Sequence, residues 1–352
     1  MDPIEIWTAA LSAALALAVL CGLMRAASAL DRWAASPSGR CGPAYGTGLV
    51  RAAALALSLV SRGPKRKPGV AAAFAFAPVA ALVAALAAAA PVQLAPAISA
   101  GAWRFSFTVW EPGAGLLFSL AMVSLWACAS FLSMAGEGDR ASRAVAVGSA
   151  AAYFSFFPAM MLALASVVLL SGKIDPAGLV ADQGDAIWRW NWARQPVAFA
   201  IFAASSCMAL RRVESGRFAG QDVARIHPQT AAAAGFVRRL SFSALAAALA
   251  AVGCSAFLGG WQLPFLPVSS LAESLRVIVP AWAVEPSVAV AGLAAMAAKS
   301  ALLLVLFAFA RASIASLRGD RLVRFAWRAL MPLAMANLAA TAYIVTVLSK
   351  GD

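Results

Sequence analysis

The sequence predicts an all-α polytopic membrane protein with about eight transmembrane helices. The first observation is composition: 62% of the 352 residues are apolar and the mean hydropathy is +0.82. A water-soluble domain of this length could not cover such a composition with polar surface. The second observation is the arrangement of the apolar residues in runs long enough to cross ~30 Å of hydrocarbon as helices. No strand-like alternation of apolar and polar residues competes with this pattern. We expect residues 1–352 to form a single membrane domain.

Each long apolar run predicts one span. The runs cover residues 4–27, 70–92, 113–135, 144–171, 195–210, 241–260, 287–310 and 326–348. The first run lacks a basic stretch before it and a small-residue cleavage site after it, so we expect a retained helix. The fifth run is short for a span. An apolar stripe within 46–61, flanked by Arg51 and Arg62, predicts an additional amphipathic helix that lies in the membrane interface.

The basic residues predict the orientation. A formal net charge of +13 would suggest a nucleic-acid partner in a soluble protein, but most of the 28 Lys and Arg residues lie in the four loops that follow odd-numbered spans. The positive-inside rule places these loops in the cytoplasm and both termini on the outer side. The charge therefore reports topology, and we expect no nucleic acid. Most tryptophans fall on the outer side, where we expect them to anchor the membrane interface.

Few side chains within the spans offer chemistry. Apart from Glu5 at the very start of the first run, no span contains Asp or Glu, which disfavours an ion carrier acting alone. Lys299 is the clear intramembrane charge; it either pairs with a neighbour or extends its ammonium toward the interface. The five cysteines form no C-x-x-C pair, and the one histidine, His227, lies in a loop. We expect no metal, no covalently bound cofactor and no catalytic residue on this chain.

The carboxyl third carries a specific series of motifs. In order these are Phe257-Leu258-Gly259-Gly260-Trp261, Lys299, Arg311-Ala312, Arg318-Gly319-Asp320, Trp327-Arg328 and Pro332-Leu333 followed by Asn337. The series resembles the family of H membrane subunits of respiratory NADH:quinone oxidoreductase (complex I), known in mitochondria as subunit 1. The family is related to the membrane anchors of group 4 [NiFe] hydrogenases. Earlier in the chain, Arg40, Gly42 and Pro43 resemble the family's turn before its interfacial helix, and Glu214 begins a stretch similar to its E-S-E-L-V-A-G loop.

The resemblance implies a function at the joint between the peripheral and membrane arms of a complex-I-type enzyme. It implies that quinone is the substrate, that other subunits of both arms are partners, and that the chain lies in the bacterial cytoplasmic membrane. By the same resemblance, Arg40, Gly42, Pro43 and Glu214 lie near the quinone chamber. Lys299, Arg318 and Asp320 have structural or coupling roles, with Arg318 and Asp320 expected to form a loop ion pair.

The sequence departs from the family at its acidic positions. Gly216 replaces the second loop glutamate, the span 144–171 has no charged residue, and Phe242 falls where a glutamate is expected early in the sixth span. We therefore expect a divergent member that has lost most residues of proton coupling. The alternatives are the membrane anchor of a hydrogenase or formate hydrogenlyase, and a non-catalytic structural or assembly paralogue. The outer loop 267–286 also exceeds the family's length, which suggests an additional contact.

Overall fold

The computed structural model describes residues 14, 18–19, 21–29, 68–100, 103–135, 140–210, 228–278, 280–314 and 319–349. Residues 21–29 are helical. The later elements are α3 (Pro68–Ala87), β1 (Ile98–Ala100), β2 (Trp103–Phe105), α4 (Gly115–Ala135), α5 (Arg140–Ser171), α6 (Pro176–Gln183), the 3₁₀ turn η1 (Ile187–Arg189), α7 (Asn191–Arg194), α8 (Pro196–Ala209), α10 (Pro228–Phe257), α11 (Val268–Ile278), α12 (Ala281–Ile314), α13 (Gly319–Phe325), the π-helical turn η2 (Ala326–Leu330) and α14 (Met331–Ser349).

Every predicted span after the first coincides with a helix. Within the described residues, five helices are long and apolar enough to cross a membrane, and 76–87 and 196–209 are shorter apolar helices. The all-α polytopic fold is therefore confirmed. The second span was predicted to reach residue 92, but α3 ends at Ala87 and a turn follows. Pro91 accounts for this end, because a proline has no N–H to donate to the carbonyl of Ala87, four residues earlier.

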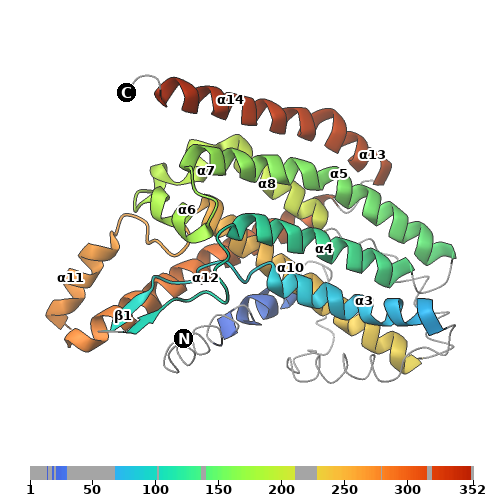
Figure 1. Cartoon of the computed structure of the whole chain (residues 1–352), viewed down its shortest axis with the longest axis horizontal. Coiled ribbons are helices and arrows are strands. Elements are labelled where there is room, and N and C mark those ends of the chain that lie inside the picture. The colour runs from blue at the N-terminus through green and yellow to red at the C-terminus, as the bar shows by residue number, and fades with distance from the viewer. Residues whose placement is uncertain are drawn as a thin grey trace.

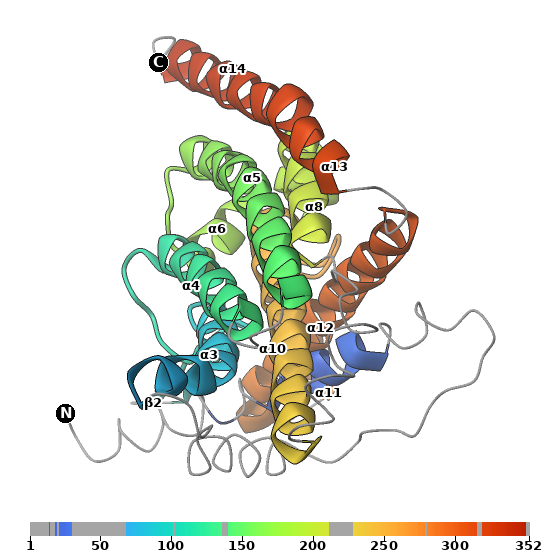
Figure 2. The same cartoon turned by 90° about the vertical axis from the view of Figure 1, so that its right-hand side faces the viewer.

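The centre of the bundle is α10. Of its apolar stretch, 89% is buried, compared with 17% for the stretch that includes α14. Its alanines allow close approach by its main contacts, α3 and α12. Gly253 serves the same purpose, because a Cβ there would lie 2.6 Å from Cε1 of Phe202 on α8. Figure 2 shows α10 between α3 and α12, with α14 at the periphery.

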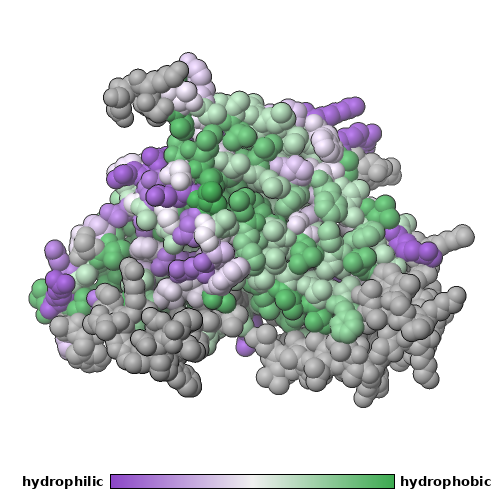
Figure 3. Space-filling view, viewed as in Figure 1, coloured by the Kyte–Doolittle hydropathy of each residue, from purple (hydrophilic) through white to green (hydrophobic). Residues whose placement is uncertain are grey.

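Two ends of the bundle carry different structures (Figure 1). At one end lie the antiparallel β1–β2 hairpin, α6, α7 and α11, all from loops predicted to be outside. We call this the hairpin end. At the opposite end, α13 leads through η2 into α14. Hydrophilic residues gather near both ends of the face shown in Figure 3, with a hydrophobic band between them. This distribution is the one expected of a membrane-spanning bundle.

The long loop 267–286 contains a helix that the apolar runs did not predict. In α11, Val268, Leu271, Ala272 and Leu275 recur at helical spacing and are partly buried, and the helix packs against α12. Val277 on the opposite side is 88% exposed. The additional length of this loop therefore forms an amphipathic helix at the hairpin end.

Candidate functional site

A tight corner follows α10 and depends on two glycines. Gly259 and Gly260 have φ values of +69° and +50°, in the left-handed region that favours glycine. A Cβ on Gly260 would lie 2.5 Å from Cγ2 of Val180 on α6, and a Cβ on Gly259 would lie 2.7 Å from Nε1 of Trp190. Both the backbone conformation and the close packing therefore require glycine in the G-G-W motif.

Lys299 of α12 fills the space beside this corner. Its Nζ donates hydrogen bonds to the carbonyl oxygens of Leu258 at 2.7 Å, Gly260 at 3.1 Å and Gln262 at 2.6 Å. The ring centroid of Trp190 lies 4.0 Å from the same nitrogen. An ammonium group has three N–H donors, which match the three carbonyls, and the face of an indole ring attracts a cation.

The contacts of Lys299 explain how a charge is tolerated at this depth. The last carbonyls of a helix and its following turn lack partners within the helix and carry partial negative charge. Lys299 supplies the missing donors from the neighbouring helix. In the described part of the chain no carboxylate contacts its ammonium group. Of the two interpretations left open for Lys299, the structure has the one in which it pairs with neighbours.

Trp190 corrects the expectation that the outer tryptophans anchor the interface. Its side chain is only 5% exposed, and its Nε1 donates to the carbonyl oxygen of Gly184 at 3.0 Å. Trp188 and Trp110 remain exposed, as an interfacial position would require. The composition of the loop could not distinguish these residues, because the difference arises from the corner against which Trp190 packs.

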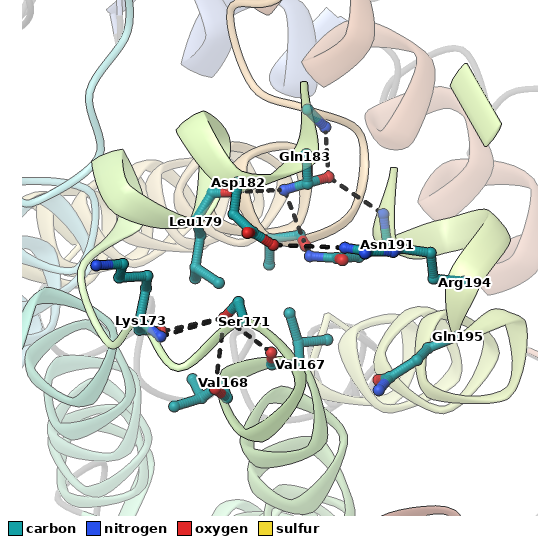
Figure 4. A network of polar contacts seen from close by, with 12 residues as sticks. Val167, Val168, Ser171, Lys173, Leu179, Asp182, Gln183, Asn191, Arg194 and Gln195 are labelled. Atoms are coloured by element: carbon teal, nitrogen blue, oxygen red, sulfur yellow. Dashed lines mark hydrogen bonds and ion pairs between the residues drawn. The ribbon is translucent and has the colours of Figure 1, made fainter. Parts of the chain in front are cut away.

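A buried glutamine joins α6 and α7 to the last turn of α10 (Figure 4). The Oε1 of Gln183 accepts from the backbone N–H of Gly259 at 2.9 Å and of Asn191 at 3.3 Å, and its Nε2 donates to the carbonyl of Ser255 at 2.8 Å. The Nδ2 of Asn191 donates to the carbonyl of Ala256 at 2.8 Å. The loop between α5 and α8 is therefore hydrogen-bonded to the same corner that Lys299 caps.

The neighbouring charged residues lie on the surface. Asp182 precedes Gln183 but forms an ion pair with Arg194 at 3.4 Å, and both side chains are more than a third exposed. Figure 4 shows this pair beside the Gln183 network. Exposed pairs of this kind contribute little to stability. The loop is thus held by its buried amides rather than by its charges.

A second polar cluster attaches α14 to the bundle. The hydroxyl of Ser166 on α5 donates to Oε1 of Gln195 at 3.0 Å and accepts from Nδ2 of Asn337 at 3.0 Å. The Nε2 of Gln195 donates to Oγ1 of Thr341 at 3.3 Å. Asn337 belongs to the P-L-x-x-x-N motif, so this motif residue docks the last helix onto α5.

Aromatic rings occupy the region where the family resemblance placed charges. The ring centroids of Trp126 on α4 and Phe242 on α10 are 6.1 Å apart, and those of Trp126 and Tyr153 on α5 are 6.3 Å apart. Tyr153 stacks on Phe157 at 5.6 Å, and its hydroxyl donates to the carbonyl of Val123 at 3.1 Å. Phe242, which falls where a glutamate was expected, therefore packs in one aromatic cluster, defined here as Trp126, Tyr153, Phe157 and Phe242.

The residues predicted to lie near the quinone chamber are outside the described residues. This applies to Arg40, Gly42, Pro43 and Glu214, and also to Arg318, His227 and the interfacial helix over 46–61. Asp320 lies in the first turn of α13, at the end of the bundle opposite the hairpin. The contacts of Lys299 are instead with the corner after α10 and with Trp190. The predicted Arg318–Asp320 ion pair stays a prediction.

Comparison with known proteins identifies the family. The family model for NADH dehydrogenase matches residues 8–214 and 233–342. A similar protein is the H subunit of NADH-quinone oxidoreductase from Anoxybacillus flavithermus, 27% identical over 240 residues that cover 66% of this chain and 63% of that protein. The H subunit numbered 2 of Cereibacter sphaeroides is 27% identical over 272 residues, covering 72% and 74% of the two chains. The corresponding H subunit of Rhodopseudomonas palustris, also numbered 2, is 28% identical over 278 residues, covering 73% and 75%.

These relatives agree with the resemblance that the sequence motifs suggested, and the matched residues include the G-G-W corner, Lys299 and Asn337. The identities are modest, as expected of a divergent member. They favour the oxidoreductase over a hydrogenase anchor, because the relatives named above are H subunits of NADH-quinone oxidoreductases. The chain therefore belongs to the NADH dehydrogenase family that includes the H subunit of NADH-quinone oxidoreductase, as a multi-pass membrane protein.

Proposed function

We propose that this chain is the membrane subunit that borders the quinone chamber of a complex-I-type NADH:quinone oxidoreductase, and that it lacks most of the acidic path for proton coupling. The aromatic cluster carries the proposal. Trp126, Tyr153, Phe157 and Phe242 form a continuous apolar contact across α4, α5 and α10. A proton path needs ionisable groups or water, and neither is favoured among packed rings.

The framework of the chain supports its place in an assembly. The G-G-W corner, Lys299 and Asn337 each make specific contacts that hold helices together. A chain that keeps these contacts retains the shape that neighbouring subunits would bind. Quinone enters this proposal as the substrate of the assembly, and the peripheral and membrane-arm subunits enter it as partners.

The same proposal includes a location in a bacterial cytoplasmic membrane with both termini outside. The basic loops support this orientation through the positive-inside rule. The end of α14 lies at the hairpin end, as that topology requires. A carboxyl-terminal alkaline phosphatase fusion should therefore be active and a matched green fluorescent protein fusion dark. The reverse pattern would contradict the orientation.

Affinity purification from native membranes in mild detergent tests the assignment. We expect iron–sulfur and other membrane subunits to copurify, and the purified complex to reduce a soluble quinone with NADH. Recovery of a nickel-site large subunit would instead support the hydrogenase anchor. Recovery of the chain alone would support the structural paralogue and contradict the proposal.

Proton coupling is tested after reconstitution into sealed liposomes. We expect NADH:quinone turnover without acidification of the lumen. Acidification is monitored with a pH-sensitive acridine dye, whose fluorescence should therefore not be quenched. A conventional complex I in matched liposomes is the positive control. Glu214→Gln then tests the remaining loop acid: we expect unchanged turnover. Dye quenching that depends on Glu214 would show that a coupling path survives.

A further inference from the structure

The ammonium group of Lys299 occupies a cage that is built from backbone. Three carbonyl oxygens, from Leu258, Gly260 and Gln262, lie 2.6 to 3.1 Å from Nζ, and the ring of Trp190 lies 4.0 Å away. Carbonyl oxygens arranged around a charge are the ligands by which proteins replace the hydration shell of K⁺. The arrangement therefore matches a monovalent-cation site in which the cation is covalently attached.

The cage persists without the lysine, because other contacts fix its walls. The backbone N–H of Gly260 donates to the carbonyl of Cys254 at 3.0 Å, and that of Gly259 donates to Oε1 of Gln183 at 2.9 Å. Trp190 is held by its own hydrogen bond to Gly184. None of these bonds involves Lys299. Shortening its side chain should leave the oxygens in place and without a donor.

The corner also includes a side-chain oxygen that has no donor within the described part of the chain. The side-chain Oε1 of Gln262 is buried and has no hydrogen-bond partner among the described residues. The three donors of an ammonium group are already used by carbonyls, whereas a metal cation accepts additional oxygens. Lys299 is itself only partly buried, so its position is not sealed within the bundle.

We propose that Lys299 acts as a tethered monovalent cation, and that the cage formed by the carbonyls of Leu258, Gly260 and Gln262 with the Trp190 ring binds free NH₄⁺ or K⁺ when this side chain is shortened. The proposal goes beyond the respiratory function. It concerns the hairpin end of the bundle, and its test needs no electron transfer.

The experiment measures thermal unfolding of the full chain, purified with its native partners, by intrinsic tryptophan fluorescence. Wild type, Lys299→Ala and Lys299→Met are compared in ammonium, potassium and choline chloride at equal ionic strength, which keeps screening constant. Alanine opens the cage, whereas methionine fills it with an uncharged chain of similar length. Choline is too large to enter.

We expect the wild type to unfold at one temperature in all three salts. Lys299→Ala should unfold several degrees lower in choline and recover saturably with NH₄⁺ or K⁺. Lys299→Met should be destabilised equally in every salt. The proposal fails if Lys299→Ala matches wild type in choline, or if the alanine and methionine variants respond alike to the small cations.

If neither variant accumulates in the membrane, acetylation of lysines in the wild-type protein provides a second test. Lys173 lies on the exposed surface of the same end of the bundle and serves as the internal control. On brief treatment with an amine-acetylating reagent, Lys173 should be modified and Lys299 protected, as measured by mass spectrometry. Acetylation of both lysines at equal rates would overturn the proposal, because a caged ammonium cannot react freely.

Discussion

Replacing Gln183 with leucine removes the amide that joins the outer loop to α10 while keeping the volume of the side chain similar. Gln183 is 0% exposed and bonds to the backbone of Gly259, Asn191 and Ser255. The leucine would leave two buried N–H groups and one buried carbonyl without these partners. Asp182→Asn is the matched control, because the adjacent carboxylate has a side chain 38% exposed and, within the part of the chain that the structure describes, bonds across the surface to Arg194.

The magnitude follows from the number of groups left unpaired. Each buried backbone group that loses its partner costs about 1–3 kcal/mol, so three groups at the low end give about 3 kcal/mol for Gln183→Leu. That free energy corresponds to a roughly hundredfold change in the unfolding equilibrium constant. The control should change the free energy of unfolding by less than about 1 kcal/mol, because exposed ion pairs are weak.

Titration with sodium dodecyl sulfate in mixed lipid micelles, followed by tryptophan fluorescence, measures both variants. We expect a clearly lower midpoint for Gln183→Leu and an unchanged midpoint for Asp182→Asn. The reasoning would be refuted if Gln183→Leu stayed within about 1 kcal/mol of wild type, since the unpaired buried groups would then carry no measurable cost. Equal losses in both variants would show that loop charge, rather than the buried amide, holds the outer segment.

The remaining predictions use the same unfolding assay. Gly260→Ala adds a Cβ that would lie 2.5 Å from a methyl group of Val180, and it also places alanine in the left-handed backbone region. Gly172→Ala places alanine in the same region at φ +66° but in open space, so it should cost only the backbone strain of about 1–2 kcal/mol. Equal losses of stability in the two variants would contradict a steric clash at Gly260. Asn337→Leu should lower the free energy of unfolding by about 0.6–2 kcal/mol, the range for interhelical hydrogen bonds in membranes. A double-mutant cycle with Ser166→Ala should show coupling between the two side chains, and strictly additive effects would argue against a hydrogen bond between them. Phe242→Glu should reduce accumulation in the membrane far more than Phe242→Leu, because an inserted carboxylate costs about 2.5–3.5 kcal/mol; equal amounts of both variants would show that the site can hold charge.

Hydropathy predicted the helices well because each span must satisfy its backbone within lipid. The short fifth run, 195–210, is confirmed as α8, which begins at Pro196 directly after Gln195. Helix ends were less predictable, as α3 shows by ending at Ala87. The last span also starts earlier than predicted, since α13 begins at Gly319 and passes through a π-helical turn just before Pro332. A proline lacks the N–H that a regular helix needs at that point, which explains the irregular turn.

The candidate site was predictable only in its parts. The G-G-W motif and Lys299 were both identified from the sequence, but their contact depends on backbone carbonyls that carry no sequence signal. Gln183 was missed because a single glutamine in a polar loop looks like a surface residue. One local signal was available: Asp175 precedes Pro176, and its carboxylate accepts from the N–H of Gly178, a typical helix start that predicts α6.

The central position of α10 has a consequence for synthesis in the cell. The ribosome delivers α3, α4, α5 and α8 to the membrane before α10, although α10 provides the buried surface of the bundle. Until it arrives, the faces of the earlier helices that will contact it must be covered by lipid or by insertion machinery. An interruption of translation just before residue 228 would therefore leave inserted helices that pack in part on one another but lack their central helix. We expect such truncated chains to be degraded rapidly, whereas chains that end after α12 lack only α13, η2 and α14 of the described elements.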